Sequence, residues 1–168
     1  MGSNYERELK SILHGDVSAI EKITKSLDQI IKMSYEKVIS KPFLVLRAAG
    51  SLGCDLVALR HDVAFPIEVK SSIERKFMFS AQSGRPALQA KQFALDCSRA
   101  GLMPIYAFRL KNAGEDPWRI FTLPNISVDG RLRIVYSKIP QICTTKSGNY
   151  IMAWENGMPL HKFLDFIC

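Results

Sequence analysis

The sequence lacks three features that would have assigned the protein to a well-defined class: paired cysteines, a long apolar run and a charged tail. The four cysteines show no C-x-x-C spacing and the three histidines are scattered, so neither a disulfide framework nor a zinc site is expected. No apolar run reaches ~18 residues, and the N-terminus has no signal-peptide pattern. We therefore expect a cytoplasmic protein with reduced thiols and no association with membranes.

What the sequence does contain is a large apolar fraction and an excess of positive charge. Of its 168 residues 47% are hydrophobic, which is enough to bury the core of one domain spanning residues 1–168. The net charge is +7, and residues 42–125 hold eleven basic and seven acidic side chains, which is most of the excess. Such a chain suits a polyanionic partner, because Lys and Arg release counterions when they contact phosphates. Charge alone does not identify that partner, since many basic proteins bind no nucleic acid.

The apolar pattern predicts helices and strands in an order typical of an α/β protein. Helices are expected at residues 3–13, 17–39, 86–100 and 159–166, and strands at 43–46, 55–59, 63–69, 103–110, 118–123 and 149–154. The three short strands between residues 43 and 69, joined by tight turns, favour an antiparallel meander. The predicted fold is α/β, with a central mixed β-sheet flanked by helices.

Individual residues add detail to this pattern. Pro66 has no N–H to donate to a sheet, so its strand is expected at an edge or with a bulge. Helix 86–100 is expected to bury a stripe that includes Leu88 and Phe93. The aromatic run at residues 77–79 fits either the core or a dimer interface, and we favour the core.

Asp55, Glu68 and Lys70 carry the clearest indication of chemistry. Glu68 and Lys70 are two apart on a predicted strand, so their side chains share one face, and Asp55 begins the neighbouring strand. Two carboxylates at one point repel each other unless they share a proton or bind a divalent cation such as Mg²⁺. Such a cation polarises a phosphoryl oxygen and acidifies a bound water, and Lys70 is suited to stabilising negative charge.

The same three residues also have a plain structural interpretation. Asp55 could cap a turn, and Glu68 and Lys70 could form a solvated pair on an exposed strand face. Spacing alone leaves both interpretations open. The apolar character of residues 55–59 and 63–69 favours the chemical one, because a fully exposed ribbon would contain fewer apolar residues.

Four short stretches resemble, in the same order, the archaeal Holliday junction resolvases, which belong to the restriction-endonuclease-like nucleases with a PD-(D/E)xK core. The stretches are residues 2–9, 43–51, 55–58 and 67–71, the last of which reads Ile-Glu-Val-Lys-Ser. The resemblance implies a restriction-endonuclease-like nuclease domain. It also implies a Mg²⁺-dependent DNA endonuclease that resolves four-way junctions by paired nicks during DNA recombination and repair.

The resemblance further implies which residues form the site. The catalytic residues would be Glu6, Ser51, Asp55, Glu68 and Lys70. The carboxylates of Glu6, Asp55 and Glu68 would bind Mg²⁺, with Mn²⁺ as a substitute. Arg7 and Arg47 would contact DNA phosphates, which position a substrate without reading its bases. The family acts on branched DNA as a homodimer and uses no nucleotide cofactor, so we expect the same here.

Two segments depart from the family pattern. Residues 14–41 insert an amphipathic helix where the family has a short connection, and residues 124–168 form a longer C-terminal extension. Both leave open a repair or restriction-type endonuclease with another DNA substrate, and a non-catalytic DNA-binding relative. The intact set of acidic residues and lysine speaks against the last of these, because a binding module has no need of two carboxylates facing phosphate.

Overall fold

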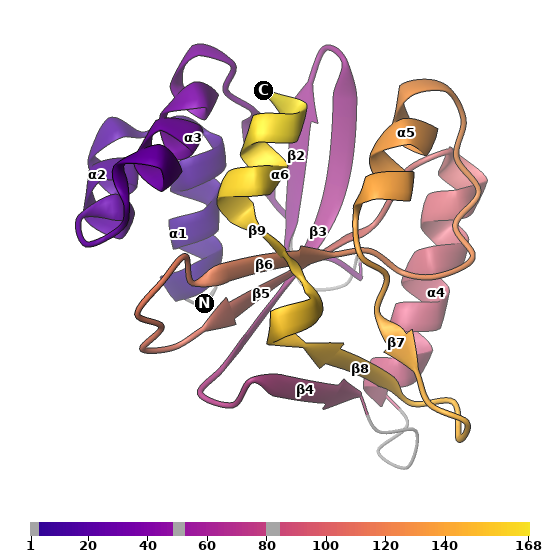
Figure 1. Cartoon of the computed structure of the whole chain (residues 1–168). Coiled ribbons are helices and arrows are strands. Elements are labelled where there is room, and N and C mark those ends of the chain that lie inside the picture. Colours follow the sequence, from indigo (N-terminus) through magenta and orange to yellow (C-terminus); the bar gives the residue numbers. More distant parts are fainter. Residues whose placement is uncertain (1–3, 49–52, 80–84) are drawn as a thin grey trace.

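The computed structural model describes residues 4–48, 53–79 and 85–168 (Figure 1). The α-helices are α1 Asn4–Leu13, α2 Val17–Thr24, α3 Gln29–Ser40, α4 Arg85–Ala100, α5 Gly130–Lys138 and α6 Leu160–Ile167, with one 3₁₀ turn, η1 Trp154–Asn156. The strands are β1 Leu44–Arg47, β2 Leu56–Arg60, β3 Val63–Ser72, β4 Lys76–Phe79, β5 Ile105–Leu110, β6 Trp118–Phe121, β7 Cys143–Thr144, β8 Tyr150–Ala153 and β9 Met158–Pro159. Within these described ranges no helix is both long and apolar enough to cross a membrane.

The centre of the fold is a six-stranded mixed sheet with the order β1-β2-β3-β5-β6-β9. Strands β1, β2 and β3 form an antiparallel meander, with Leu44 opposite Leu59 and Leu56 opposite Ile67. Strand β5 pairs with β3 in parallel after the crossover through α4, and β6 and β9 are added antiparallel. The predicted meander and the predicted class, a central mixed sheet flanked by helices, are both confirmed.

Pro66 lies inside the sheet, because β3 is the third of six strands. The predicted edge position is therefore wrong for the strand as a whole. At Pro66 itself, however, β3 has a neighbouring strand on one side only. Val57 of β2 lies opposite Pro66, whereas the parallel pairing with β5 begins one residue later, at Ile67↔Ile105. The missing N–H thus falls where β3 has only one neighbouring strand, so no sheet hydrogen bond is lost to a second one.

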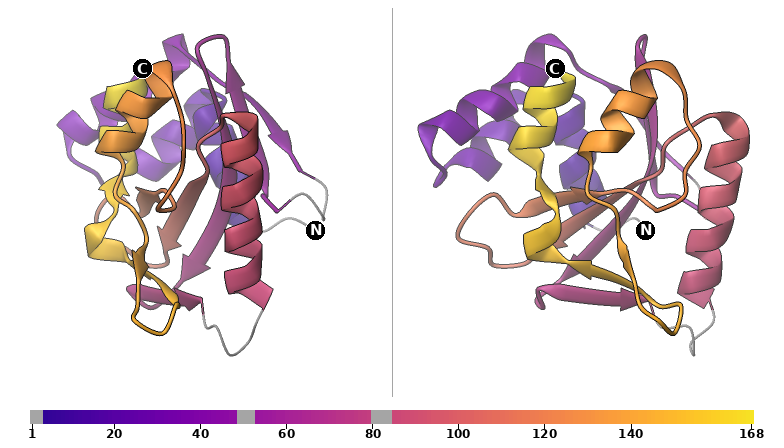
Figure 2. Two further views of the ribbon diagram at one scale, coloured as in Figure 1. Left: turned by 90° about the vertical axis from the view of Figure 1, so that its right-hand side faces the viewer. Right: turned by 45° about the vertical axis from the view of Figure 1, so that its right-hand side comes forward.

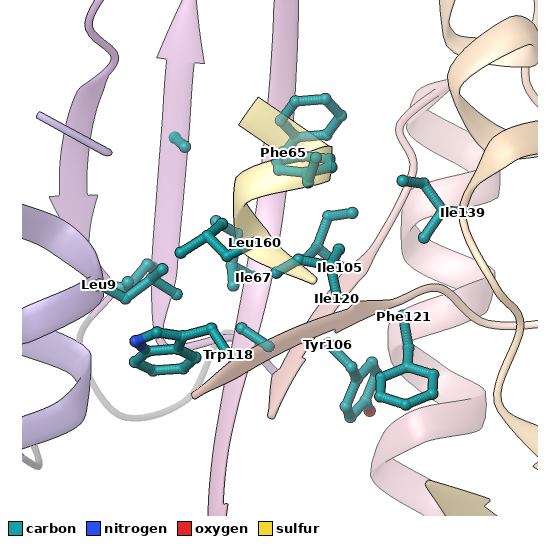
Figure 3. Packing of buried hydrophobic residues seen from close by; sticks show 14 of the residues in the cluster. Leu9, Phe65, Ile67, Ile105, Tyr106, Trp118, Ile120, Phe121, Ile139 and Leu160 are labelled. Carbon is teal, nitrogen blue, oxygen red and sulfur yellow. The ribbon is translucent and has the colours of Figure 1, made fainter. Parts of the chain in front are cut away.

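Alternation along the strands gives the sheet two faces covered by different helices. On one face, Phe65 and Ile67 are buried, and the rings of Phe65 and Phe163 of α6 lie 5.7 Å apart. On the other face, the ring of Tyr106 lies 6.0 Å from that of Phe93 in α4. Figure 2 shows α6 and α4 on opposite sides of β5 and β6, and Figure 3 shows side chains of both faces packed into one core.

A second sheet, with the order β4-β8-β7, extends the face that α4 covers. Phe79 of β4 is only 1% exposed, and its ring lies 5.6 Å from Tyr106. Phe77 is partly buried against Phe108, whereas Met78 between them is 59% exposed. The two phenylalanines of this run therefore belong to the core, as we favoured. The strand predicted at residues 149–154 is confirmed as β8.

The predicted helix at residues 17–39 is wrong, because two helices occupy this segment. The N–H of Leu27 donates to the carbonyl of Thr24 as α2 ends, and the carboxylate of Asp28 accepts from the N–H of Ile30, 2.8 Å away, to cap α3. A capping aspartate starts a new helix in a new direction. Ile30 would lie on the apolar stripe of a single helix with Ile20, Ile23 and Leu27, but in α3 it is 74% exposed.

The buried stripe of α4 also differs from the predicted one. Phe93 is buried as expected, but Leu88 is 66% exposed, and the stripe runs through Ala87 and Ala90 to Cys97. Neighbouring helical residues point about 100° apart, so a stripe that begins at Ala87 turns Leu88 to the outside. The alanines allow the helix to approach the sheet more closely than leucines would.

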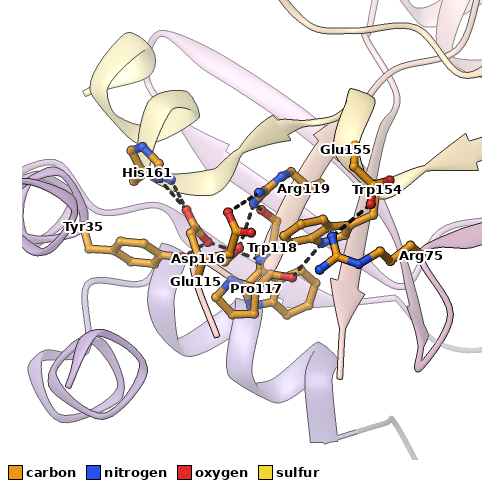
Figure 4. A network of polar contacts seen from close by, with 10 residues as sticks. All are labelled: Tyr35, Arg75, Glu115, Asp116, Pro117, Trp118, Arg119, Trp154, Glu155 and His161. Atoms are coloured by element: carbon orange, nitrogen blue, oxygen red, sulfur yellow. Dashed lines mark hydrogen bonds and ion pairs between the residues drawn. The ribbon is translucent and has the colours of Figure 1, made fainter. Parts of the chain in front are cut away.

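The insertion and the C-terminal extension both meet the core at Asp116, in the loop between β5 and β6 (Figure 4). Asp116 is 2% exposed, and Oδ1 accepts from the hydroxyl of Tyr35 in α3 at 2.8 Å and from the N–H of Trp118 at 3.2 Å. Oδ2 contacts the N–H and Nδ1 of His161 in α6, at 3.0 and 2.7 Å. One buried carboxylate therefore connects α3 and α6 to the central sheet.

Directly after the turn η1, the chain comes very close to β6 at Gly157. A Cβ on Gly157 would lie 2.6 Å from Cβ of Arg119 and 2.7 Å from ring atoms of Phe121. The guanidinium of Arg119 in turn lies 3.6 Å from the ring centre of Trp154. This close approach requires glycine because there is no room for a side chain.

Candidate active site

Asp55 lies one residue before β2, where the chain enters the meander. Its N–H donates to the carbonyl of Ile67 and its own carbonyl accepts from the N–H of Ala48, both at 2.9 Å. Its carboxylate Oδ2 accepts from the N–H of Val69 at 2.7 Å. Two of these hydrogen bonds fix Asp55 against β3, beside the stretch that carries Glu68 and Lys70, and the third joins it to the residue after β1.

Glu68 and Lys70 lie on the same face of β3, as the period of two predicts. Lys70 Nζ donates to Glu68 Oε1 at 2.6 Å. The side chain of Glu68 is 9% exposed and that of Lys70 is 24% exposed. The interpretation as a solvated pair on an open strand face is therefore wrong, because the carboxylate is nearly enclosed while the ammonium reaches toward solvent.

Tyr106 of β5 lies opposite Glu68 in the parallel register and is 3% exposed. Burial, and then the charge of Glu68, raise the pKa of the Tyr106 hydroxyl well above its ordinary value. Cys54, half-buried, has a thiol pKa that is raised by burial and by the charges of Glu68 and Asp55. Both residues contribute to the surroundings of the two carboxyls.

The two carboxyls also perturb each other. Burial raises the pKa of Glu68; Lys70 opposes this effect and the neighbouring Asp55 adds to it. Burial likewise raises the pKa of Asp55, the N–H of Val69 opposes this, and the charge of Glu6 adds to it. A negative site of this kind favours either a proton or a cation, although the protein as a whole is basic.

Glu6 projects from the first turn of α1 toward this site, but its carboxylate has another partner. Arg47, the last residue of β1, lies 3.3 Å from Glu6 Oε2, and the Glu6 side chain is 16% exposed. Because its charge affects the pKa of Asp55, Glu6 belongs to the same region. Arg7, the next residue on α1, is exposed and faces a neighbouring groove. Ser51, predicted near the scissile strand, lies outside the described residues.

The described residues fit a cation held by two carboxylates rather than three. Among them, no group of three histidine, cysteine, aspartate or glutamate side chains is arranged to hold a metal ion. The carboxylate of Asp55 is bonded to Val69, the residue next to Glu68, and burial raises the pKa of both acids. One or two carboxylates, completed by water and substrate phosphate, are the usual protein ligands of Mg²⁺. The donor set is therefore suited to Mg²⁺ in the presence of a phosphodiester.

Sequence reasoning missed Tyr106 and Cys54 for different reasons. Tyr106 is brought to Glu68 by the parallel pairing of β3 with β5. Because α4 separates these strands in the sequence, no local spacing of residues predicts this contact. Cys54 directly precedes Asp55, so adjacency could have pointed to it. Its burial beside two acids becomes visible only when β2 and β3 are paired.

A scan against protein-family models and a search of curated proteins find no match for this chain. Among solved structures, the chain is similar to Hjc, a Holliday junction resolvase from the archaeal hyperthermophile Archaeoglobus fulgidus. The match has a TM-score of 0.47 and 21% sequence identity, and it covers 73% of this chain and 82% of that one. A likeness this distant does not transfer an activity, so the function has to be inferred from the residues of the site.

Proposed function

We propose that the protein is a metal-dependent DNA endonuclease that hydrolyses phosphodiester bonds at Asp55, Glu68 and Lys70. The observation that carries this proposal is a nearly enclosed glutamate, Glu68, with an ammonium 2.6 Å away, on the same stretch of β3 whose Val69 N–H holds the carboxylate of Asp55. A structural role alone would not explain why two acids are enclosed together, because burial raises the pKa of both carboxyls and Asp55 raises that of Glu68 further.

The chain's own residues have distinct tasks in this proposal. Asp55 is oriented by the N–H of Val69, so one carboxylate oxygen keeps a fixed direction. Glu68, held by Lys70, is able to accept a proton from an attacking water. Lys70 is the more exposed of the pair, and its ammonium is suited to stabilising charge that develops on the phosphate. A divalent cation bound by Asp55 and Glu68 would polarise the phosphate and acidify a water.

Glu6, Arg7 and Arg47 complete the proposed site. Glu6 lies near Asp55 and, once released from Arg47, would serve as a further ligand or would orient the water. Arg47 and Arg7 would then pair with phosphates, because a guanidinium binds phosphate oxygens in the same way as carboxylate oxygens. The exchange of Arg47 from Glu6 to a phosphate would couple DNA binding to completion of the site.

The first test compares two glutamate substitutions. Glu68→Gln keeps the shape and an acceptor for Lys70 but removes the charge, so Mg²⁺-dependent cleavage of DNA should be lost while DNA binding persists. Glu74→Gln makes the same change in an exposed turn and should leave cleavage unchanged. Cleavage is followed by gel electrophoresis, and full activity of Glu68→Gln would refute the assignment of the site.

The substrate we propose is a four-way DNA junction, cut by paired nicks from a homodimer in recombination and repair. The resemblance of the sequence motifs supports this choice. The edge strand β1 offers an apolar surface for a second copy, because Leu44 and Leu46 on it are 57% and 49% exposed. Mg²⁺, or Mn²⁺ in its place, would be the only cofactor.

The junction and the dimer are tested separately from the chemistry. Junction, flap and linear duplex substrates are compared for the rate and symmetry of nicking. Equal cleavage of all three would contradict the junction as substrate, but the protein would still be an endonuclease. Leu44→Glu should shift a dimer to monomer in sedimentation. A single species of dimer mass in both proteins would show that β1 is not the interface.

A further inference from the structure

A groove of about 680 Å³ lies between α1, α2 and the loop that follows β5, on the opposite side of α1 from Glu6. Arg7 and Glu8 contribute to it from α1, Lys22 from α2, Arg109 from β5 and Glu115 from the loop. One wall is therefore part of the 14–41 insertion.

The two acids in the groove already have cationic partners. Glu8 Oε1 accepts from Arg109 Nε at 2.8 Å, and it also accepts from the indole N–H of Trp118 at 2.8 Å. Glu115 lies 3.2 Å from Arg119. The carboxylates therefore contribute little net negative charge to the space, because each is compensated by a guanidinium.

Two of the cations, in contrast, are available to a ligand. Arg7 and Lys22 are exposed, and among the described residues neither forms a salt bridge. The neutral lining adds side-chain amides and hydroxyls that donate hydrogen bonds. These neutral polar residues are Asn4, Ser11, Ser26 and Asn112. The net character is that of an anion site with several hydrogen-bond donors.

The size of the groove limits what it holds. Spaces of about 300–1,000 Å³ accommodate a ligand of drug or nucleotide size. A duplex is far larger than this, whereas a single strand tracks a basic groove with its backbone. A phosphodiester in the groove would contact Arg7 from α1 and Lys22 from α2, because both residues line it.

We propose that this groove binds the phosphodiester backbone of a single DNA strand. This inference rests on the proposed nuclease function and gives the 14–41 insertion a role, because α2 supplies Lys22. The substrate class is then branched DNA that carries an unpaired strand. A free nucleotide shares the chemistry of the ligand, and the experiment separates the two.

The test measures binding without cleavage. Fluorescence anisotropy with Glu68→Gln protein in EDTA compares a labelled four-way junction with the same junction carrying one single-stranded arm. Lys22→Gln in this background should weaken binding of the single-stranded arm severalfold. It should also make the slope of log K against log salt shallower by about 0.7, the value for one contact with a single strand. Lys25→Gln is the matched control, because it removes the same charge from the end of the same helix and does not line the groove.

Three outcomes overturn the proposal. In the first, Lys22→Gln and Lys25→Gln change the affinity for the single-stranded arm equally. In the second, Lys22→Gln weakens binding of both junctions equally. In the third, calorimetry detects binding of dAMP that Lys22→Gln abolishes, while the single-stranded arm still binds. The last result would make the groove a nucleotide site. Because binding is read in EDTA, a failure here is distinct from a failure of Glu68→Gln to abolish cleavage. Urea midpoints of both lysine variants should match the parent, which shows that the fold is intact.

Discussion

The buried hydrogen bond between Tyr35 and Asp116 gives the most direct test of how the insertion is held to the core. Tyr35→Phe removes only the hydroxyl, which donates to Asp116 Oδ1 at 2.8 Å (Figure 4). Tyr35 is fully buried and Asp116 is 2% exposed, so no water replaces the lost partner. Burial raises the pKa of the Tyr35 hydroxyl well above its usual value, so the group remains a protonated donor.

The size of the effect follows from the acceptor. A hydrogen bond to a charged group contributes about 1.5–3 kcal/mol, whereas one to a neutral group contributes about 0.5–1.5 kcal/mol. Asp116 keeps its contacts with Trp118 and His161, so the variant leaves no isolated buried charge. We expect Tyr35→Phe to lower the free energy of unfolding by about 1.5–3 kcal/mol. For a chain of this length that corresponds to a fall in Tm of about 3–12 °C.

Urea unfolding followed by tryptophan fluorescence measures this difference, with Tyr136→Phe as the control. The hydroxyl of Tyr136 donates to the carbonyl of Leu123 at 3.0 Å and accepts from the N–H of Ile126 at 3.3 Å, both neutral partners. Tyr136 is only partly buried, so water can replace the hydroxyl and its loss should cost less. In an Asp116→Asn background the effect of Tyr35→Phe should shrink, because the charge is gone. Equal losses for Tyr35→Phe and Tyr136→Phe would refute the reasoning.

Three further predictions follow from the geometry. Because the folded-state pKa values of Asp55 and Glu68 are raised, the metal-free protein should lose stability as pH rises from the ordinary carboxyl range through these higher values. Glu68→Gln should remove part of this loss at neutral pH, as thermal unfolding at several pH values would measure, and a flat profile would contradict it. Gly157→Ala should destabilise by about 1–3 kcal/mol through overpacking against β6, while Gly114→Ala, with open space around it, should not. Asp28→Ala should cost about 1 kcal/mol in urea unfolding through loss of the cap of α3, and an unchanged midpoint would argue against that cap.

The sequence by itself determined the features that depend on local patterns. Period-2 spacing placed Glu68 and Lys70 on one face, and apolar runs separated by tight turns predicted the antiparallel meander, because register and side-chain direction follow from adjacent residues. The excess of basic over acidic residues predicts a polyanionic partner, and this partner stays a prediction. Local patterns misled where a single residue overrides them, as Asp28 does by starting a new helix inside an apparently continuous stripe.

Only the tertiary structure decided which distant residues meet. The parallel register of β3 with β5 brings Tyr106 to Glu68, and α1 brings Glu6 and Arg47 together, although no spacing along the chain predicts either contact. The same holds for Asp116, where the insertion and the C-terminal extension converge. Burial is the physical reason, because whether an acid is solvated or enclosed depends on segments packed around it from elsewhere in the chain. The sequence thus proposed the acids at the centre of the site, and tertiary packing gave them the enclosed, mutually repelling environment that favours a cation.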